Sequence, residues 1–298
     1  QTKIKKLYLK RVSSRVKGVF YNFSPGIAIP FLGLLINYPL YFFDVIFNTI
    51  TKKPKVIVIY NFDPINLLLT SVIRLFFTKI KLVNNIEDVS VPKFSDFNKK
   101  SEDRGVQQLI FFFCMRIIAK MSHAYIIPTK KFISFLPEKQ NILVLTGCIK
   151  VNQNVSLVRN KINILFAGKI AFEHGIDIFI DAIELINSKG FLNDFEIHIS
   201  GGGEKSNWVE NKLKMLNYDN VSFHGFTSNA FYKKLLDQSD ICVALQNPNG
   251  RHSEFKTPSK VYEYMGNSKA VVATNVGDLK VVSDLGIIKL CNPLKASH

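Results

Sequence analysis

The stretch NGRHSEFKTPSKVYEYMGNSKAVVAT, from Asn249 to Thr274, contains the helix around which we expect the second half of the chain to fold. Thr257 is a suitable N-cap, and Pro258 is tolerated at the first helical position because an N–H there would have no partner. The pair Gly266-Asn267 is typical of a helix end. The stretch therefore predicts a helix that begins at Pro258 and ends near Gly266.

The two sides of this predicted helix differ in chemistry. Val261 and Met265 can face a core, whereas Lys260 and Glu263 lie three residues apart and share another face. A helix N-terminus with a lysine in its first turn attracts phosphate, and a carboxylate one turn later can accept hydrogen bonds from sugar hydroxyls. This arrangement fits a nucleoside diphosphate. The same spacing also fits a surface salt bridge between neighbouring turns.

The composition indicates a globular protein with room for two domains. The chain has 298 residues, of which 47% are hydrophobic, so it can bury a sizeable core. Its four cysteines lie far apart among apolar residues, with no pair at metal-ligand spacing. This pattern predicts reduced core thiols and fits a cytosolic compartment. The cysteines are Cys114, Cys148, Cys242 and Cys291.

The net charge of +16 is unevenly distributed. Between Gln1 and Lys17 there are seven Lys or Arg and no acidic residue, and large apolar residues lie between them. A basic segment of this kind fits an anionic membrane surface, a nucleic acid or a solvated basic helix.

Two apolar stretches, 27–50 and 107–127, are long enough to be considered as membrane spans. Prolines, asparagines and charged residues interrupt them, and such residues are costly in hydrocarbon. We therefore expect helices that pack on the protein or lie in the bilayer interface. No signal peptide is visible, but the chain opens with Gln1 rather than Met, so we expect that a true N-terminus is missing.

Strand and helix patterns alternate along the chain, which predicts parallel sheets with helical crossovers. The continuous β-branched run KVIVIY, Lys55 to Tyr60, predicts a strand buried on both faces. The polar segment from Val151 to Lys161 has no period, so we expect one domain over 1–150 and a second over 151–298. Further strands are expected at 18–23, 80–84, 124–127, 141–145, 162–167, 195–200, 221–223, 240–245 and 270–274, and further helices at 65–77, 106–121, 176–188, 208–216 and 230–238.

Three loops follow predicted strands, at the edge where open α/β sheets bind ligands. Residues 168–175 offer backbone N–H groups and Lys169, and residues 201–203 are glycines that allow close backbone approach. Residues 224–226 offer an aromatic ring and exposed backbone that can receive a nucleobase. Each pattern alone is also typical of an ordinary turn. The sequence lacks a P-loop, a dinucleotide fingerprint, a Gly-x-Ser-x-Gly elbow and a His-Glu-x-x-His motif.

Taken together, these segments resemble the retaining, nucleotide-sugar-dependent glycosyltransferases of family 4, the group 1 glycosyltransferases, in their Pro-Ser-Lys subgroup. That family has the GT-B fold, an α/β architecture of two Rossmann-like domains facing across a cleft. The resembling pieces occur in the family's order and spacing over most of 162–278, and the first half resembles the acceptor domain more loosely. The pieces are FAGKIAFEHGIDIFIDAI, EIHISGGGE, NVSFHGF, YKKLLDQSDICVAL and TPSKVYEYMGNSKAVVATNVGD, with KPKVIVIYNFDP and KLVNNIEDVS in the first half.

The resemblance implies a donor site in the second domain. Lys169 and Lys260 match positions that contact the donor diphosphate, and Glu263 matches the carboxylate that holds the ribose. Cations and a helix dipole would stabilise the departing nucleoside diphosphate, so no metal is expected to be required. The other residues expected to bind the donor are Gly168, His174, Gly202, His224, Gly225, Phe226, Glu254, Lys256 and Ser259.

The chain departs from the family pattern at several positions. His174 stands where the family often has Lys, and Phe255 stands where the first Glu of a paired motif is expected, with Glu254 one position away. Ser268 and Ala270 replace an expected Gly and Pro. The first βα unit and its Gly-rich acceptor loop are not evident, nor are the crossover helices after Leu290. We therefore expect a chain truncated at the N-terminus, and we consider a truncated C-terminus as well.

The resemblance implies a hexosyltransferase at the inner face of the cell membrane, cytoplasmic and peripherally bound. It would move a sugar from a nucleoside diphosphate to a lipid-linked or other saccharide acceptor in capsule, exopolysaccharide or O-antigen synthesis, with no nucleic-acid partner. Two alternatives stay open. A non-hydrolysing sugar-nucleotide epimerase of the same architecture would convert a UDP-sugar without an acceptor, and a nucleic-acid-binding protein would show steeply salt-dependent binding.

Overall fold

The computed structural model describes residues 12–16, 19–23, 32–62, 64–87, 106–136, 141–147, 151–152, 160–247, 255 and 257–291. The chain divides into two compact units. The first unit comprises residues Gln1–Ile126 and Phe135–Leu143, and the second comprises Ile127–Ser134 and Val144–His298. Of the expected features, Glu254, Lys256, Cys148 and the loop at 89–105 lie outside the described residues.

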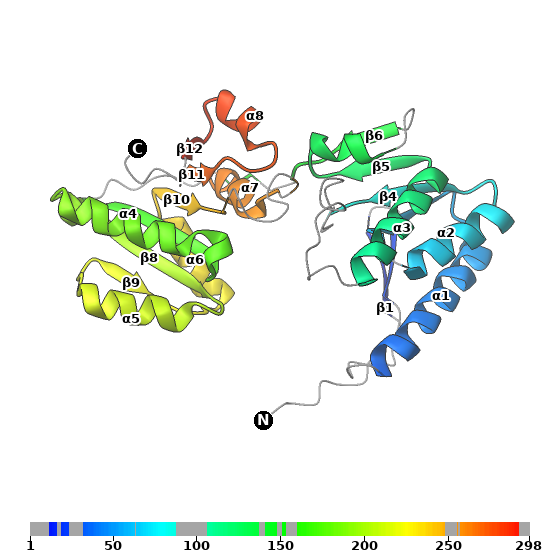
Figure 1. Ribbon diagram of the computed structural model, residues 1–298, viewed down its shortest axis with the longest axis horizontal. Coiled ribbons are helices and arrows are strands. Elements are labelled where there is room, and N and C mark those ends of the chain that lie inside the picture. The colour runs from blue at the N-terminus through cyan, green and yellow to red at the C-terminus, as the bar shows by residue number, and fades with distance from the viewer. Residues whose placement is uncertain are drawn as a thin grey trace. The chain divides into compact units, whose positions relative to one another are not determined.

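The first unit contains a four-stranded sheet in the order β3-β4-β5-β6, in which β3, β4 and β5 are parallel. Helix α2 packs against both α1 and α3, and Figure 1 shows the three helices together beside the strands. The elements are α1 (Leu32–Lys52), β3 (Val56–Tyr60), α2 (Pro64–Phe76), β4 (Lys81–Asn85), α3 (Val106–Met121), β5 (Ala124–Ile127) and β6 (Asn141–Val144). The 3-10 helix η2 (Lys130–Phe135) follows β5, and its residues up to Ser134 belong to the second unit.

The first described residues form an antiparallel pair, β1 (Val12–Val16) and β2 (Val19–Phe23). The described part of the basic segment is therefore a strand, so a basic helix over these residues is wrong. The pairing partner decides this outcome, because a strand follows two residues after β1 and local periodicity does not report such pairing. No helix in the described residues is long and apolar enough to cross a membrane.

Strand β3 is not buried on both faces, contrary to the prediction from its β-branched run. Ile57 and Ile59 pack into a cluster with α2 and β4, whereas Val56, Val58 and Tyr60 point to the other face and are about half exposed. Strand residues alternate between faces, so a strand covered by helices on one side exposes every second residue. Composition alone does not report which faces are covered.

The second unit is built on a six-stranded sheet of parallel strands in the order β12-β11-β10-β7-β8-β9. The strands are β7 (Ile162–Lys169), β8 (Phe195–Gly202), β9 (Val221–Phe223), β10 (Ile241–Ala244), β11 (Ala270–Thr274) and β12 (Lys289–Cys291). The helices are α4 (Ile176–Ser188), α5 (Ser206–Leu216), α6 (Asn229–Gln238), α7 (Ser259–Gly266) and α8 (Leu279–Asp284), and short 3-10 turns η3 (Phe172–His174) and η4 (Leu192–Asp194) precede α4 and β8.

Helices cover both faces of this sheet. Along β7, Ile164 and Phe166 pack with α4 and α5, while Leu165 and Ala167 pack with α6, α7 and α8. Four consecutive residues of one strand are therefore buried, as expected for a central strand between two helical layers. The result is a three-layer α/β unit with two separate apolar clusters.

The strand order also fixes where a ligand can bind. The chain runs outward from β7 through β8 to β9, then returns to the other side of β7 and continues through β10 and β11 to β12. Connections leave β7 and β10 in opposite directions, so a crevice opens between their carboxyl ends. Helix α7 follows β10 in the chain and brings its N-terminus to this edge.

The central helix has the predicted extent but not the predicted cap. Pro258 is the N-cap, with an extended backbone at φ −71° and ψ 99°, and helical geometry begins at Ser259. The Thr257 hydroxyl instead donates a hydrogen bond to the Pro128 carbonyl oxygen, at 3.2 Å. A tertiary acceptor therefore takes the hydroxyl that was expected to cap the helix.

Candidate donor-binding site

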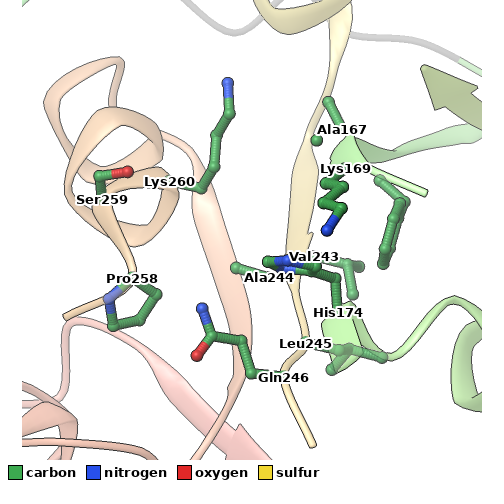
Figure 2. Close-up of a pocket in the computed structure, with 12 residues that line it drawn as sticks. Ala167, Lys169, His174, Val243, Ala244, Leu245, Gln246, Pro258, Ser259 and Lys260 are labelled. Atoms are coloured by element: carbon green, nitrogen blue, oxygen red, sulfur yellow. The ribbon is translucent and has the colours of Figure 1, made fainter. Parts of the chain in front are cut away.

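A pocket of about 200 Å³ lies at the carboxyl ends of β7 and β10. Figure 2 shows Pro258, Ser259 and Lys260 at the start of α7 on one side, and Lys169 and His174 on the other. Two lysines and the N-terminus of a helix therefore border one cavity, which is an arrangement suited to an anion. The pocket is lined by Phe166, Ala167, Gly168, Lys169, His174, Val243, Ala244, Leu245, Gln246, Pro258, Ser259 and Lys260.

A second pocket of about 360 Å³ adjoins the first and shares four of its residues, including both lysines. It extends past the glycines at the end of β8 toward Phe226, whose side chain is 90% exposed. An exposed ring beside a cavity offers a surface on which a planar base can stack. The pocket is lined by Ala167, Gly168, Lys169, Ser200, Gly201, Gly202, Phe226, Thr227, Asn229, Tyr232 and Lys260.

Glycines let the two strand ends approach closely at this edge. Gly201 has φ +144°, and a Cβ atom built on it would lie 1.8 Å from the Gly168 carbonyl oxygen. A Cβ on Gly203 would lie 2.3 Å from the Ile170 carbonyl oxygen. No other residue fits these positions without displacing backbone, so the bare backbone that lines the second pocket is a consequence of strand packing.

The ammonium of Lys260 contacts both charged and aromatic side chains. Its Nζ lies 2.8 Å from Glu263 Oε2 and donates to the Tyr232 hydroxyl at 2.9 Å. It also lies 4.2 Å from the centre of the Tyr232 ring. The predicted shared face of Lys260 and Glu263 is therefore present, and in this structure the two side chains form the salt bridge that was the simpler expectation.

Lys169 differs from Lys260 in its surroundings. It ends β7 and lines both pockets, and its ammonium makes no hydrogen bond or ion pair with the described residues. A lysine with an unengaged ammonium at the crevice can accept an anionic ligand without first breaking a contact. Of the two predicted cations, Lys169 is therefore the more available one.

His224 lines neither pocket, whereas Phe226 lines the second one. Its Nε2 lies 3.1 Å from His198 Nδ1, and its ring meets the edge of Phe231. Burial lowers the pKa of both imidazoles, and for His224 the adjacent His198 lowers the pKa further. The two rings therefore favour a neutral pair, in which one N–H is shared between the facing nitrogens.

The predicted residues fall into three groups in the structure. Gly168, Lys169, His174, Gly202, Phe226, Ser259 and Lys260 line the two pockets. Glu263 and His224 lie beside them without lining either, and Gly225 supplies the left-handed turn at φ +61° between His224 and Phe226. Glu254 and Lys256 are outside the described residues. The roles assigned to all of these residues stay predictions.

Phe255 stands at the position where the first carboxylate of the expected pair would be. Its side chain is buried, and its ring lies 5.0 Å from that of Phe132 in the same unit. In this chain the position therefore contributes to apolar packing.

Sequence reasoning missed two residues of the site. Tyr232 contacts both Lys260 and Glu263, and Gln246 lines the first pocket with a buried Oε1 that has no hydrogen-bond partner within the described chain. The position of Tyr232 on α6, close to the apolar Leu235 and Leu236, suggests only a core residue. Gln246 follows β10 by two residues, so the rule for carboxyl strand ends could have identified it.

Comparison with known proteins agrees with this geometry. Residues 161–291 match the family model Glycosyl transferases group 1. This segment contains the whole six-stranded sheet and both pockets. A comparison with curated proteins finds no match.

Solved structures of glycosyltransferases resemble the chain over most of its length. Sucrose-phosphate synthase from Thermosynechococcus elongatus has a TM-score of 0.67 at 13% identity, over 96% of this chain and 73% of that one. The pneumococcal O-GlcNAc transferase GtfA, in complex with UDP and GlcNAc, has 0.57 at 12%, over 89% and 55%. Anabaena HepE, in complex with UDP and glucose, has 0.53 at 16%, over 90% and 72%.

At these identities the likeness establishes the fold alone. The predicted α/β architecture with parallel sheets, of the GT-B type, is confirmed. The chain spans only about half of the pneumococcal GtfA chain that it resembles.

Proposed function

We propose that this protein is a glycosyltransferase that moves a hexose-type sugar from a nucleoside diphosphate to an acceptor, with retention at the anomeric carbon. The observation that carries the proposal is the pair of lysines, Lys169 and Lys260, at the crevice of a sheet that matches the group 1 family. A departing nucleoside diphosphate develops negative charge at its bridging oxygen, and fixed cations stabilise that charge.

In the proposed complex the diphosphate lies between Lys169 and the start of α7. The base occupies the second pocket, beside Phe226 and the glycine-lined strand ends, and Glu263 accepts hydrogen bonds from the ribose. Uracil is the favoured base, because two of the similar structures, GtfA and HepE, are complexes with UDP. The proposal needs no metal ion, so activity should persist after treatment with EDTA.

Isothermal titration with UDP-, GDP- and ADP-sugars tests the donor site. We expect one of these donors to bind, and Lys260→Ala and Glu263→Ala each to weaken its binding. Lys280→Ala is a matched control, since Lys280 pairs with Asp284 on α8 and lines neither pocket. Unchanged donor binding in both site variants contradicts the assignment.

Two further assays distinguish the other two interpretations of the sequence. Conversion of a UDP-sugar in the absence of any acceptor identifies an epimerase. Binding of DNA or RNA that weakens steeply with salt, without binding of any nucleotide sugar, identifies a nucleic-acid-binding protein. The family match and the glycosyltransferase neighbours favour neither alternative.

We also propose that the acceptor is a lipid-linked saccharide of a surface polysaccharide and that the enzyme works at the cytoplasmic face of a membrane. The support is a stripe on α1, in which Leu40, Phe43, Phe47 and Ile50 are all exposed at helical spacing. The exposed lysines 52, 53 and 55 follow the stripe directly. An apolar helix face beside basic residues suits an anionic bilayer surface.

Co-sedimentation with vesicles tests this location. We expect binding to phosphatidylcholine vesicles that contain phosphatidylglycerol, and loss of binding when Phe43 and Phe47 are both changed to Ser. Phe191→Ser is the control, because Phe191 is a similarly exposed phenylalanine in the second unit. Equal vesicle binding by the double variant and the control contradicts a role for the stripe.

A further inference from the structure

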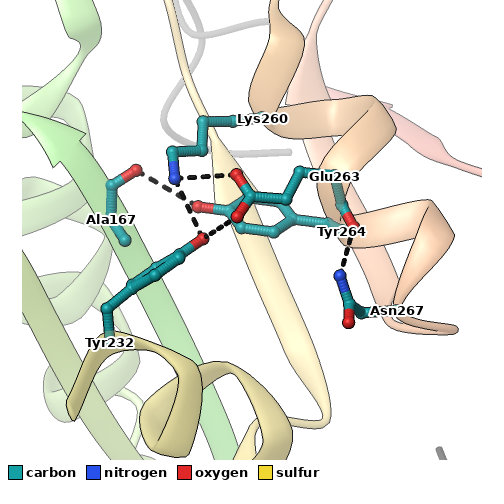
Figure 3. Close-up of polar contacts among 6 residues, drawn as sticks. All are labelled: Ala167, Tyr232, Lys260, Glu263, Tyr264 and Asn267. Carbon is teal, nitrogen blue, oxygen red and sulfur yellow. Dashed lines mark hydrogen bonds and ion pairs between the residues drawn. The ribbon is translucent and has the colours of Figure 1, made fainter. Parts of the chain in front are cut away.

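The hydroxyl of Tyr232 links the two charged side chains that the donor site is expected to use. It accepts a hydrogen bond from Lys260 Nζ at 2.9 Å and donates one to Glu263 Oε1 at 2.9 Å, while Lys260 Nζ contacts Glu263 Oε2 at 2.8 Å (Figure 3). The three groups therefore form a closed triangle in which both carboxylate oxygens of Glu263 are engaged.

The surrounding helix holds the phenol in place. Tyr232 lies on α6, whose N-cap Ser228 accepts a hydrogen bond from the Phe231 N–H, and whose Leu235 and Leu236 are buried in the core. Burial raises the pKa of the Tyr232 phenol far above its usual range, and the neighbouring Tyr264 and Glu263 raise it further. The hydroxyl therefore keeps its proton and can donate to the carboxylate.

Without this phenol the charged pair would have little to order it. The side chains of Lys260 and Glu263 are 36% and 37% exposed, and exposed pairs one turn apart are weak and change rotamer readily. Tyr232 adds two hydrogen bonds and a ring under the ammonium, at 4.2 Å from its centre. The pair is thereby held in one arrangement at the wall of the second pocket, which Tyr232 and Lys260 both line.

A second tyrosine, Tyr264, fixes helix α7 against the sheet. Tyr264 is fully buried, and its hydroxyl donates to the Ala167 carbonyl oxygen at 3.2 Å (Figure 3). This bond ties α7 to β7, the strand that carries Lys169. The ammonium of Lys260 is therefore positioned against the strand end by α6 on one side and by α7 itself on the other.

We propose that Tyr232 is a positioning residue of the donor site, which orders Lys260 and Glu263 for the diphosphate and ribose of a nucleoside diphosphate. The inference rests on the proposed function and adds a residue to it. Ordering two flexible side chains before the ligand arrives removes an entropic cost from binding. The ammonium keeps a third N–H for a phosphate oxygen, and the carboxylate keeps lone pairs for ribose hydroxyls, so the triangle can persist in the complex.

Titration of the full chain with UDP, GDP and ADP tests the proposal, with Tyr232→Phe as the variant. Phenylalanine keeps the ring and its packing and removes only the hydroxyl. We expect the dissociation constant of the nucleotide that binds to rise about tenfold, as for a hydrogen bond to a charged group. Tyr218→Phe is the matched control, because Tyr218 is half-buried and accepts a hydrogen bond from Asn187, yet lines neither pocket.

A double-mutant cycle separates positioning from a general structural role. In a background that carries both Lys260→Met and Glu263→Ala, Tyr232→Phe should change nucleotide affinity less than about twofold, because the hydroxyl acts through these two side chains. A full tenfold effect in that background, or an affinity of Tyr232→Phe equal to that of the unmodified chain, overturns the proposal. Failure of the unmodified chain to bind any of the three nucleotides instead overturns the proposed function itself.

Discussion

The two units share a parallel βα architecture but end their strands in different chemistry. In the first unit the carboxyl ends of β3 and β4 carry Asn61, Asn85 and Glu87, which bond to one another. In the second unit the corresponding edge carries glycines and lysines, with open pockets between them. The fold therefore supplies the location of a site in each unit, and the residues at the strand ends decide what can bind there.

The edge of the first unit is occupied by its own side chains. The Glu87 carboxylate accepts from Tyr60 at 3.2 Å and from Asn85 at 2.9 Å, and the Glu87 N–H donates to Asn61 Oδ1 at 2.8 Å. Asn61 adopts the left-handed conformation at φ 56°, which asparagine tolerates better than most residues. A carboxylate and amides suit neutral hydroxyls, as on a sugar, and the negative charge of the carboxylate repels a diphosphate.

The edge of the second unit has opposite properties. Gly168, Gly201 and Gly203 have no side chains to fill it, and close backbone packing requires glycine at the latter two positions. The Lys169 ammonium has no hydrogen-bond or ion-pair partner among the described residues, so positive charge is available there. The two edges therefore differ in bare backbone and available positive charge, although they share one topology.

The largest effect, on stability, is expected from a substitution that disrupts the glycine-lined edge. Gly201→Ala would place a methyl group 1.8 Å from the Gly168 carbonyl oxygen at a backbone φ of +144°. We expect a loss of unfolding free energy of about 3–5 kcal/mol, from strain and overpacking together. Urea denaturation measures the loss. Gly190→Ala is the control, since its φ is +80° but open space surrounds it, and it should cost only about 1–2 kcal/mol. Equal losses for the two variants would contradict the close-packing argument.

The next largest effect, on donor binding, is expected when the Lys169 ammonium is removed. Lys169→Ala should weaken donor binding by about 10- to 100-fold, the value of a charge-assisted hydrogen bond to a diphosphate, with little change in stability. Isothermal titration and thermal unfolding of the same sample measure both quantities. A change of less than twofold, matching that of the Lys280→Ala control, would show that the second unit's edge does not bind the donor through this lysine.

A smaller effect is expected at the edge of the first unit. Glu87→Gln keeps the size of the side chain and removes its charge, so the hydrogen bonds from Tyr60 and Asn85 weaken. We expect the acceptor KM to rise by roughly three- to tenfold, as for one weakened polar contact, while donor affinity stays unchanged. Steady-state kinetics at saturating donor measures this split. A change in donor affinity instead would mean that the two edges do not divide the substrates as described.

The smallest effect concerns the histidine pair of the second unit. Burial lowers the pKa of His198 and of His224 below the usual 6.5, so between 6.5 and these lowered values the unfolded chain binds more protons than the folded one. Stability contributed by the neutral pair is therefore fully present above pH 6.5 and is lost as the pH falls through the folded pKa values. Titration of the ring resonances by NMR measures them. Folded pKa values at or above 6.5 would contradict a desolvated neutral pair.

Regular elements in the second unit were predictable because their local signals agree with their tertiary surroundings. The strand at 221–223 and the helix at 176–188 have the predicted bounds, and the strand from Ile162 runs only two residues further than expected. Two short elements near the end of the chain, α8 and β12, were missed. With six and three residues, they are too short for periodicity to identify, and the neighbouring strand β11 and its helices stabilise them.

The sequence by itself determined the alternation of strands and helices, the extent of α7 and the clustering of lysines and glycines after strands. These features follow from local spacing, which the chain carries whether or not it is folded. Only the tertiary structure decided that β3 exposes one face, that Thr257 bonds to Pro128 instead of capping α7, and that Tyr232 contacts Lys260 and Glu263. Each of these outcomes depends on a partner at least 20 residues away or on coverage by other elements, and packing of the folded chain alone brings such groups together.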